Sequence, residues 1–301
     1  MDLPADTGHD PVLLNETVSL IDPRPGMTVV DCTVGRGGHS QAIAARIAPD
    51  GLLLALDADP RNLEFARARL ANAPCRVRFF HANFAELPDV LAESEAPQVD
   101  AILADLGLST NQLFDPQYGL SFANPMKLDM RIDPRSRKSV VDLLNHLSET
   151  DLANVLYNNA QERYSRRIAR KIVEARRASP ITTTDRLAEL VRSALPSRGG
   201  APPKIDPATK TFMALRMEVN QEIGNLGALL KQAPRHLRSG GRLAVISFHS
   251  TEDRLVKQAF RSLEQAGLLK VLTKKPLTPS DDELARNPRS RSAKLRVAQR
   301  A

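Results

Sequence analysis

The stretch Val29–Ser40, VVDCTVGRGGHS, packs three glycines into four positions directly after a short apolar run. A glycine-rich turn between a strand and a helix brings backbone N–H groups close to a ligand with no side chain in the way. The P-loop pattern is absent because no lysine follows the glycines, and a dinucleotide fingerprint would need a third glycine where Ser40 stands. With Asp31 ahead of Gly35 and Gly37, the loop favours S-adenosylmethionine, and a dinucleotide stays open as the alternative.

Strand and helix patterns alternate through residues 1–108. Apolar runs over residues 26–33, 51–57, 75–82 and 99–107 predict strands, and the segments between them have helical periodicity. Such alternation is typical of an α/β fold with a parallel, doubly wound sheet.

This alternation stops after Leu108. Residues 109–208 carry loop and helix patterns only, which predicts a helical domain inserted into the sheet domain. The sheet domain then comprises residues 1–108 and 209–301, the second part ending in a basic tail. A long helix is predicted over residues 211–237, a strand over 242–248, a helix over 251–267, and closing strands over 268–273 and 293–300.

Charge is divided unevenly along the chain. The net charge is +7 overall, but it is −9 over residues 1–126, +7 over residues 127–211 and +6 over residues 286–301. Basic charge concentrated in the insertion and the tail is expected where those parts face a polyanion, although a solvated helix face explains it equally well.

Composition indicates a soluble, cytoplasmic protein. No apolar run approaches the roughly 20 residues of a membrane span, and the first ten residues are acidic where a signal peptide would be basic and then apolar. Cys32 and Cys75 are far apart and have no histidine cluster near them, so neither a disulfide nor a metal site is expected.

Polar and aromatic residues follow the other predicted strands. Asp57 ends the second strand, Phe84 follows the third and Asp105 ends the fourth. The carboxyl ends of parallel strands meet at one edge of a sheet, so these residues are expected to share a crevice with the glycine turn. A carboxylate at Asp57 suits the two hydroxyls of a ribose in either nucleotide-type cofactor.

Longer blocks of the sequence carry a family resemblance. DCTVGRGGHS, GLSFANPMKLDMRID, GGRLAVISFHSTEDRLVK and RSRSAKLRVAQR resemble, in order and spacing, the ribosomal RNA small subunit methyltransferase H (MraW) family, from about residue 9 to residue 300. The resemblance implies a class I, Rossmann-like sheet dependent on S-adenosyl-L-methionine, with an inserted helical substrate-recognition domain. It implies methyl transfer to the exocyclic N4 of a cytidine in the decoding centre of 16S rRNA within the small ribosomal subunit. The implied cofactor contacts are Gly37, Gly38, His39, Asp57, Phe84, Asp105 and Gln112.

Methyl transfer to an amine requires alignment of nucleophile, methyl carbon and sulfur. The cytosine amine is a poor nucleophile, and an acceptor oxygen that holds its N–H helps to localise the lone pair. Asp105 is the predicted catalytic acceptor, with a backbone carbonyl in DLGLS as the alternative. The expected substrate contacts are Arg131, Arg163, Arg166, Arg170 and His249.

Several of these residues also have a structural interpretation. Ser250 and Asp253 have capping-box spacing, which would make His249 part of a turn. Phe114, Tyr118 and Phe122 are candidates for stacking on an extruded base, and core packing explains them about as well.

Two other functions remain open at this stage. The same methyl donor could serve a DNA amino-methyltransferase, because a basic insertion does not separate RNA from DNA. A non-enzymatic ribosome-assembly or RNA-binding factor could also retain such a fold.

Overall fold

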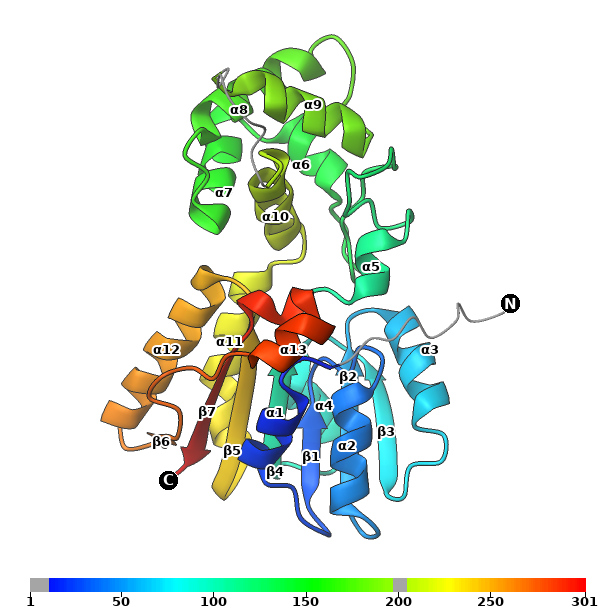
Figure 1. Ribbon diagram of the computed structural model, residues 1–301, viewed down its shortest axis with the longest axis vertical. Coiled ribbons are helices and arrows are strands. Elements are labelled where there is room, and N and C mark those ends of the chain that lie inside the picture. Colours follow the sequence, from blue (N-terminus) through cyan, green and yellow to red (C-terminus); the bar gives the residue numbers. More distant parts are fainter. Residues whose placement is uncertain (1–10, 197–204) are drawn as a thin grey trace. The chain divides into compact units, whose positions relative to one another are not determined.

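The chain divides into two compact units, which Figure 1 shows in a computed structural model that describes residues 11–196 and 205–301. We call Met1–Gly107 with Ile223–Ala301 the sheet unit, and Leu108–Glu222 the helical unit. Within the described ranges, no helix combines the length and the apolar character that crossing a membrane requires.

The described part of the sheet unit forms a seven-stranded sheet of order β3-β2-β1-β4-β5-β7-β6. Neighbours from β3 through β5 are parallel, whereas β7 runs antiparallel to both β5 and β6. The α/β fold predicted from the alternating pattern is therefore confirmed. The strands are β1 (Thr28–Asp31), β2 (Leu52–Asp57), β3 (Arg76–His81), β4 (Val99–Asp105), β5 (Leu237–Ser247), β6 (Leu269–Val271) and β7 (Lys294–Arg300).

Alternate side chains of the central strands bury into two different cores. Val30 and Ile102 belong to one apolar cluster, whereas Val29 and Leu103 belong to the other. Successive side chains of a strand point to opposite faces, so a sheet that is covered on both faces needs apolar residues at successive positions. The first face is covered by α4 (Leu87–Glu93), α11 (Glu222–His236) and α12 (Ser250–Gln265), and the second by α1 (Leu14–Ile21), α2 (Gly38–Ile47) and α3 (Pro60–Arg69).

Cys32, which follows β1, is one of the residues that fill the first core. It is 1% exposed and packs in the same cluster as Val30. Burial raises the pKa of its thiol, so it behaves as a small apolar side chain and not as a nucleophile.

The helical unit has a core of its own. Ile168 and Ile172 of α8 are fully buried, with Tyr164 and Ala175 packed against the same cluster, so one face of the helix is apolar. The helices are α5 (Thr110–Phe114), α6 (Val140–His146), α7 (Glu149–Ala160), α8 (Ser165–Arg176), α9 (Thr184–Ala194) and α10 (Ala208–Val219).

The long helix predicted over residues 211–237 is wrong, because the chain forms two helices there. The first, α10, ends at Val219, and Gln221 takes a left-handed conformation with φ of 49° before α11 begins. The Asn220 side chain accounts for the break: its oxygen accepts from the Ile132 N–H at 2.9 Å, and its nitrogen donates to the Met130 carbonyl at 2.8 Å.

The second boundary of the insertion also differs from the predicted residue 208. Helix α10 packs against α7, and the Asn159 side chain of α7 donates to the Ala214 carbonyl and to Glu218 of α10. The helical unit therefore extends to Glu222.

Three short helices have no counterpart in the predicted elements. These are α1, α5 and α13 (Asp281–Arg286), of eight, five and six residues. Each is too short for its periodicity to stand out from the surrounding loop.

Two glycines of the sheet unit offer a matched test of this packing. An alanine Cβ at Gly51 would collide with the Ile47 carbonyl and lie 2.6 Å from the Ile47 Cβ, whereas one at Gly227 in α11 would meet nothing within 4 Å. We expect Gly51→Ala to lower the free energy of unfolding by about 2 kcal/mol or more, and Gly227→Ala to raise it by up to about 1 kcal/mol. Urea unfolding followed by circular dichroism measures both, and equal effects would contradict the packing described here.

Candidate functional site

The glycine turn connects β1 to α2 at the carboxyl edge of the sheet. Gly37 has φ of 80°, a left-handed conformation that glycine adopts at no steric cost, and Gly38 begins the helix. A Cβ at Gly38 would lie 2.9 Å from the Pro11 ring, so a segment of chain passes directly over the turn. Two of the three glycine N–H groups donate within the site: that of Gly37 to the Val34 carbonyl at 2.7 Å, and that of Gly35 to the Asp57 carboxylate.

Asp57 at the end of β2 is tied to the same turn. Its carboxylate accepts from the Gly35 and Asp59 N–H groups, each at 2.8 Å, and from the Asn62 side chain at 3.3 Å. The residue is 8% exposed, and burial raises the pKa of its carboxyl to about 7. A carboxylate whose orientation is fixed by these hydrogen bonds can accept from a pair of neighbouring hydroxyl groups.

Asp31 at the end of β1 lies beneath the turn. The Ser40 hydroxyl donates to its carboxylate at 2.7 Å, and the Thr33 N–H donates at 3.1 Å. Burial raises the pKa of Asp31 to about 6. Ser40, which stands in the place of a third glycine, thus holds a buried carboxyl at the first turn of α2.

Asp105 at the end of β4 has one oxygen without a partner. Its N–H donates to the Thr33 hydroxyl at 2.7 Å, but within the described residues its buried Oδ1 has no hydrogen bond. Burial raises the pKa of the Asp105 carboxyl well above its usual range, and the nearby Asp31 and Glu252 charges add to this effect. An orphaned buried oxygen of this kind is where a donor group of a ligand belongs.

His39 connects the helix start to Asp105. Its Nδ1 lies 3.6 Å from the Asp105 Oδ2, and its Nε2 lies 3.0 Å from the Val12 carbonyl oxygen. The ring is buried, so its orientation is set by these contacts and by packing.

The loop after β3 completes this group. Phe84 begins a single 3-10 turn over Phe84–Glu86, held by a capping box in which the Asn83 side chain and Glu86 exchange backbone hydrogen bonds. The Ala82 N–H donates to the Asp57 carbonyl at 3.1 Å, which ties this loop to the end of β2. Phe84 is half-buried against the core beside α4 and keeps part of its ring exposed.

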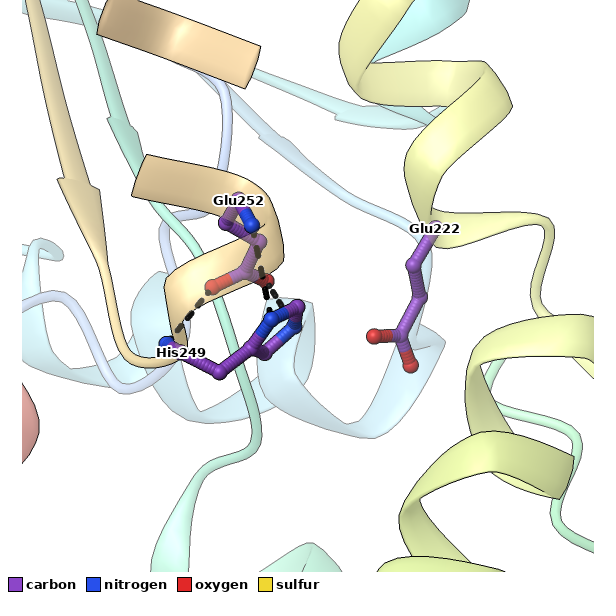
Figure 2. A group of neighbouring side chains, drawn as sticks. All are labelled: Glu222, His249 and Glu252. Atoms are coloured by element: carbon purple, nitrogen blue, oxygen red, sulfur yellow. Dashed lines mark hydrogen bonds and ion pairs between the residues drawn. The ribbon is translucent and has the colours of Figure 1, made fainter. Parts of the chain in front are cut away.

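His249 caps the start of α12, as Figure 2 shows. The predicted Ser250–Asp253 capping box is wrong: Glu252 accepts from the Phe248 N–H at 2.9 Å and the His249 N–H at 3.3 Å, one residue earlier. The Glu252 side chain also lies 3.1 Å from the His249 Nε2. Asp253 instead accepts from Arg296 of β7 at 2.6 Å.

The remaining candidates belong to the helical unit. Gln112 is buried and forms a capping box with Ser109 at the start of α5. Arg131 forms a bidentate ion pair with Asp129 at 2.7 and 2.8 Å and donates to the Ser136 carbonyl. Most of the N–H groups of its guanidinium therefore stabilise the loop between these residues. Glu222, which is not among the predicted site residues, is also drawn in Figure 2, and Arg216 holds it at 2.8 Å.

Three arginines lie on α8 or just before its start, with Arg163 two residues ahead of the helix. Arg163, Arg166 and Arg170 are exposed, and the buried stripe of the helix lies on the opposite side. Arg166 donates to Asn154 at 3.2 Å and Arg170 lies 3.5 Å from Glu149. Such exposed contacts are weak and easily exchanged for another anion.

The aromatic candidates separate into core and surface. Tyr118 is 8% exposed, and the Phe122 ring packs on that of Phe212 with centroids 4.6 Å apart. Both contribute to the core of the helical unit, whereas Phe114 is 52% exposed.

Sequence reasoning missed several residues that shape this site. The Ser40 and Asn62 side chains donate to the Asp31 and Asp57 carboxylates, and the Thr33 hydroxyl accepts from the Asp105 N–H. Pro11–Leu13 passes over the glycine turn. The hydroxyl and amide residues carry no individual signal in the sequence, because their role depends on strands that meet only in the fold.

Comparison with known proteins gives a consistent assignment. Residues 6–301 match the model of the MraW methylase family. The ribosomal RNA small subunit methyltransferase H of Acidobacterium capsulatum is 45% identical over 299 residues, covering 97% of this chain and 98% of the relative. That of Trichodesmium erythraeum is 46% identical over 294 residues, covering 97% and 99%.

The raised pKa of Asp57 predicts a pH dependence of stability. A carboxyl whose folded pKa lies above its usual value contributes stability at low pH, and this is lost as the pH rises through the folded pKa. The stability of the wild type relative to Asp57→Asn should therefore fall by about 2–4 kcal/mol between pH 4 and pH 8. Urea unfolding of both proteins across this range measures the difference, and a pH-independent difference would contradict the assignment.

Proposed function

The chain belongs to the MraW methylase family, and we propose that it transfers a methyl group from S-adenosyl-L-methionine to the exocyclic N4 of a cytidine in the decoding centre of small-subunit rRNA. The observation that carries this proposal is the buried Oδ1 of Asp105, which has no hydrogen bond to any residue in the described part of the chain. A site that keeps one acceptor free of internal hydrogen bonds is prepared to receive an N–H donor.

The residues at the carboxyl edge of the sheet fit S-adenosyl-L-methionine, which supplies the methyl group in this reaction. Asp57 would accept from the ribose hydroxyls, and Phe84 would pack against the adenine. Gly37, Gly38 and His39 would contact the methionine end, and Gln112 stays a predicted contact of the same cofactor. The bound donor supplies an electrophilic methyl carbon on a sulfonium.

Asp105 would act on the amine that receives the methyl group. The amine's lone pair is delocalised into the cytosine ring, and an acceptor oxygen on its N–H favours the form in which the pair is available for attack. A buried oxygen in a low-dielectric site acts more strongly than one in water. The rest of the barrier is lowered by positioning, because in-line displacement depends on alignment.

The RNA would contact the helical unit and the start of α12. The exposed Arg163, Arg166 and Arg170 supply positive charge for phosphates. Arg131, whose guanidinium is held by Asp129, would contact the RNA with the part of its side chain that this ion pair leaves exposed. His249 would contact the target nucleotide.

The direct test offers tritiated S-adenosyl-L-methionine with small ribosomal subunits, naked rRNA or DNA. We expect label in N4-methylcytidine from the ribosomal substrate alone, identified by nucleoside analysis. Label in DNA would favour a DNA amino-methyltransferase. Cofactor binding without transfer to any substrate would favour an RNA-binding or ribosome-assembly factor.

The Asp105→Asn variant accompanies this test as the control for mechanism. It keeps the size of the side chain but replaces the ionisable carboxyl with an amide, whose single oxygen is a weaker, uncharged acceptor and whose nitrogen can only donate. Normal turnover by this variant, with cofactor binding intact, would contradict the role of Asp105. It would favour a backbone carbonyl in DLGLS as the acceptor instead.

Removing charge on α8 and just before it tests the RNA contact. Replacing Arg163 and Arg170 with glutamine should weaken subunit binding and reduce the slope of log K against log salt by about two, because about one counterion is released per phosphate contact. Fluorescence anisotropy with labelled rRNA across a salt series measures this slope.

The matched control removes the same charge elsewhere in the helical unit. Arg186 of α9 and Lys210 of α10 are exposed and lie outside α8. An equal loss of slope in Arg186→Gln with Lys210→Gln would mean that the effect comes from net charge and not from the face of α8.

A further inference from the structure

A short stretch of backbone, Pro11–Leu13, lies across the glycine turn and is fixed at three consecutive residues. Pro11 packs on Gly38, where a Cβ would come within 2.9 Å of its ring. The Val12 carbonyl lies 3.0 Å from the His39 Nε2, and the Leu13 N–H donates to the Glu283 Oε1 at 2.8 Å. We call this stretch the strap.

The contact with Glu283 joins distant parts of the chain. Glu283 lies on α13, 270 positions from Leu13, and the bond is partly shielded from solvent. Leu13 itself is fully buried and left-handed, with φ of 53°, a conformation uncommon for a residue with a branched side chain. The carboxylate of Glu283 therefore holds a backbone conformation that the strap would not readily adopt by itself.

The Val12 carbonyl decides which nitrogen of His39 carries the proton. A carbonyl oxygen can only accept a hydrogen bond, so Nε2 must be the protonated nitrogen. In the neutral ring, Nδ1 is then an acceptor, and it is this nitrogen that lies 3.6 Å from the Asp105 Oδ2. The strap thus sets both the orientation and the tautomer of the ring that faces the catalytic carboxyl.

We propose that Glu283 is a positioning residue of the cofactor site, acting through Leu13 and Val12 to orient His39 toward Asp105. This rests on the roles proposed above for His39 and Asp105. Glu283 itself touches neither the donor nor the RNA in this scheme. Its function is to hold the strap on the turn, so that the unprotonated Nδ1 of the imidazole faces Asp105 and accepts from the protonated Oδ2, while Oδ1 stays an acceptor.

The test compares three variants of the full-length protein. Glu283→Ala removes the acceptor, whereas Glu283→Gln keeps a side-chain oxygen that can accept from the Leu13 N–H. Glu264→Ala is the matched control, because the Glu264 Oε1 also accepts a backbone N–H at 2.8 Å, from Val271, elsewhere in the sheet unit. Binding of S-adenosyl-L-methionine is measured by calorimetry, and the His39 tautomer by ¹⁵N chemical shifts, with His39→Gln to assign the signal.

We expect Glu283→Ala to weaken binding by about ten- to a hundredfold, the effect of losing one charge-assisted hydrogen bond. Its His39 signal should move from the Nε2–H tautomer toward a mixture. Glu283→Gln should restore both readouts, and Glu264→Ala should leave both unchanged.

Two results would overturn the proposal. One is an unchanged His39 signal in Glu283→Ala, and the other is an equal loss of binding in Glu264→Ala. Either can occur while the wild type still labels rRNA, so failure here is distinct from failure of the proposed function. Conversely, a shifted His39 signal with no methyl transfer by the wild type would support the strap and refute the reaction.

Discussion

The pairing of β1 with strands on both sides is the constraint on which the site depends. Asp31 at its end is level with Ala55 of β2 and Leu103 of β4, so the three strands end within two residues of one register. Parallel strands in this register bring the carboxyls of Asp31, Asp57 and Asp105 to one edge. Because helices cover both faces, these carboxyls are withdrawn from water, and their raised pKa values follow from that position.

Much of this edge could be predicted from the sequence, because its signals are local. The glycine turn, the acidic strand ends and the alternation of strands and helices are each recognisable from neighbouring residues around Gly37, Asp57 and Asp105. The residues that hold these groups could not be predicted in the same way. Thr33 supports Asp105 from 72 positions away, and Glu283 supports the strap from the other end of the chain.

The errors have a common physical origin. The long helix over residues 211–237 has good periodicity throughout, but the Asn220 side chain satisfies the backbone of a distant loop and the helix breaks there. The capping box at α12 shifted by one residue because His249 can act as a cap, a role more typical of serine. In both cases a tertiary contact or an unusual cap outweighed local propensity.

Ser40 has a consequence for which small molecules the turn rejects. A helix start beside a glycine turn usually attracts phosphate, because its N–H groups carry partial positive charge. Here the Ser40 hydroxyl anchors the Asp31 carboxyl at that start, and the carboxyl takes the Thr33 N–H as well. A pyrophosphate would meet a buried acidic group instead of a free positive pole, while a cationic ligand would be attracted by it. Ser40 and Asp31 therefore make the start of α2 less favourable for a pyrophosphate than a glycine would.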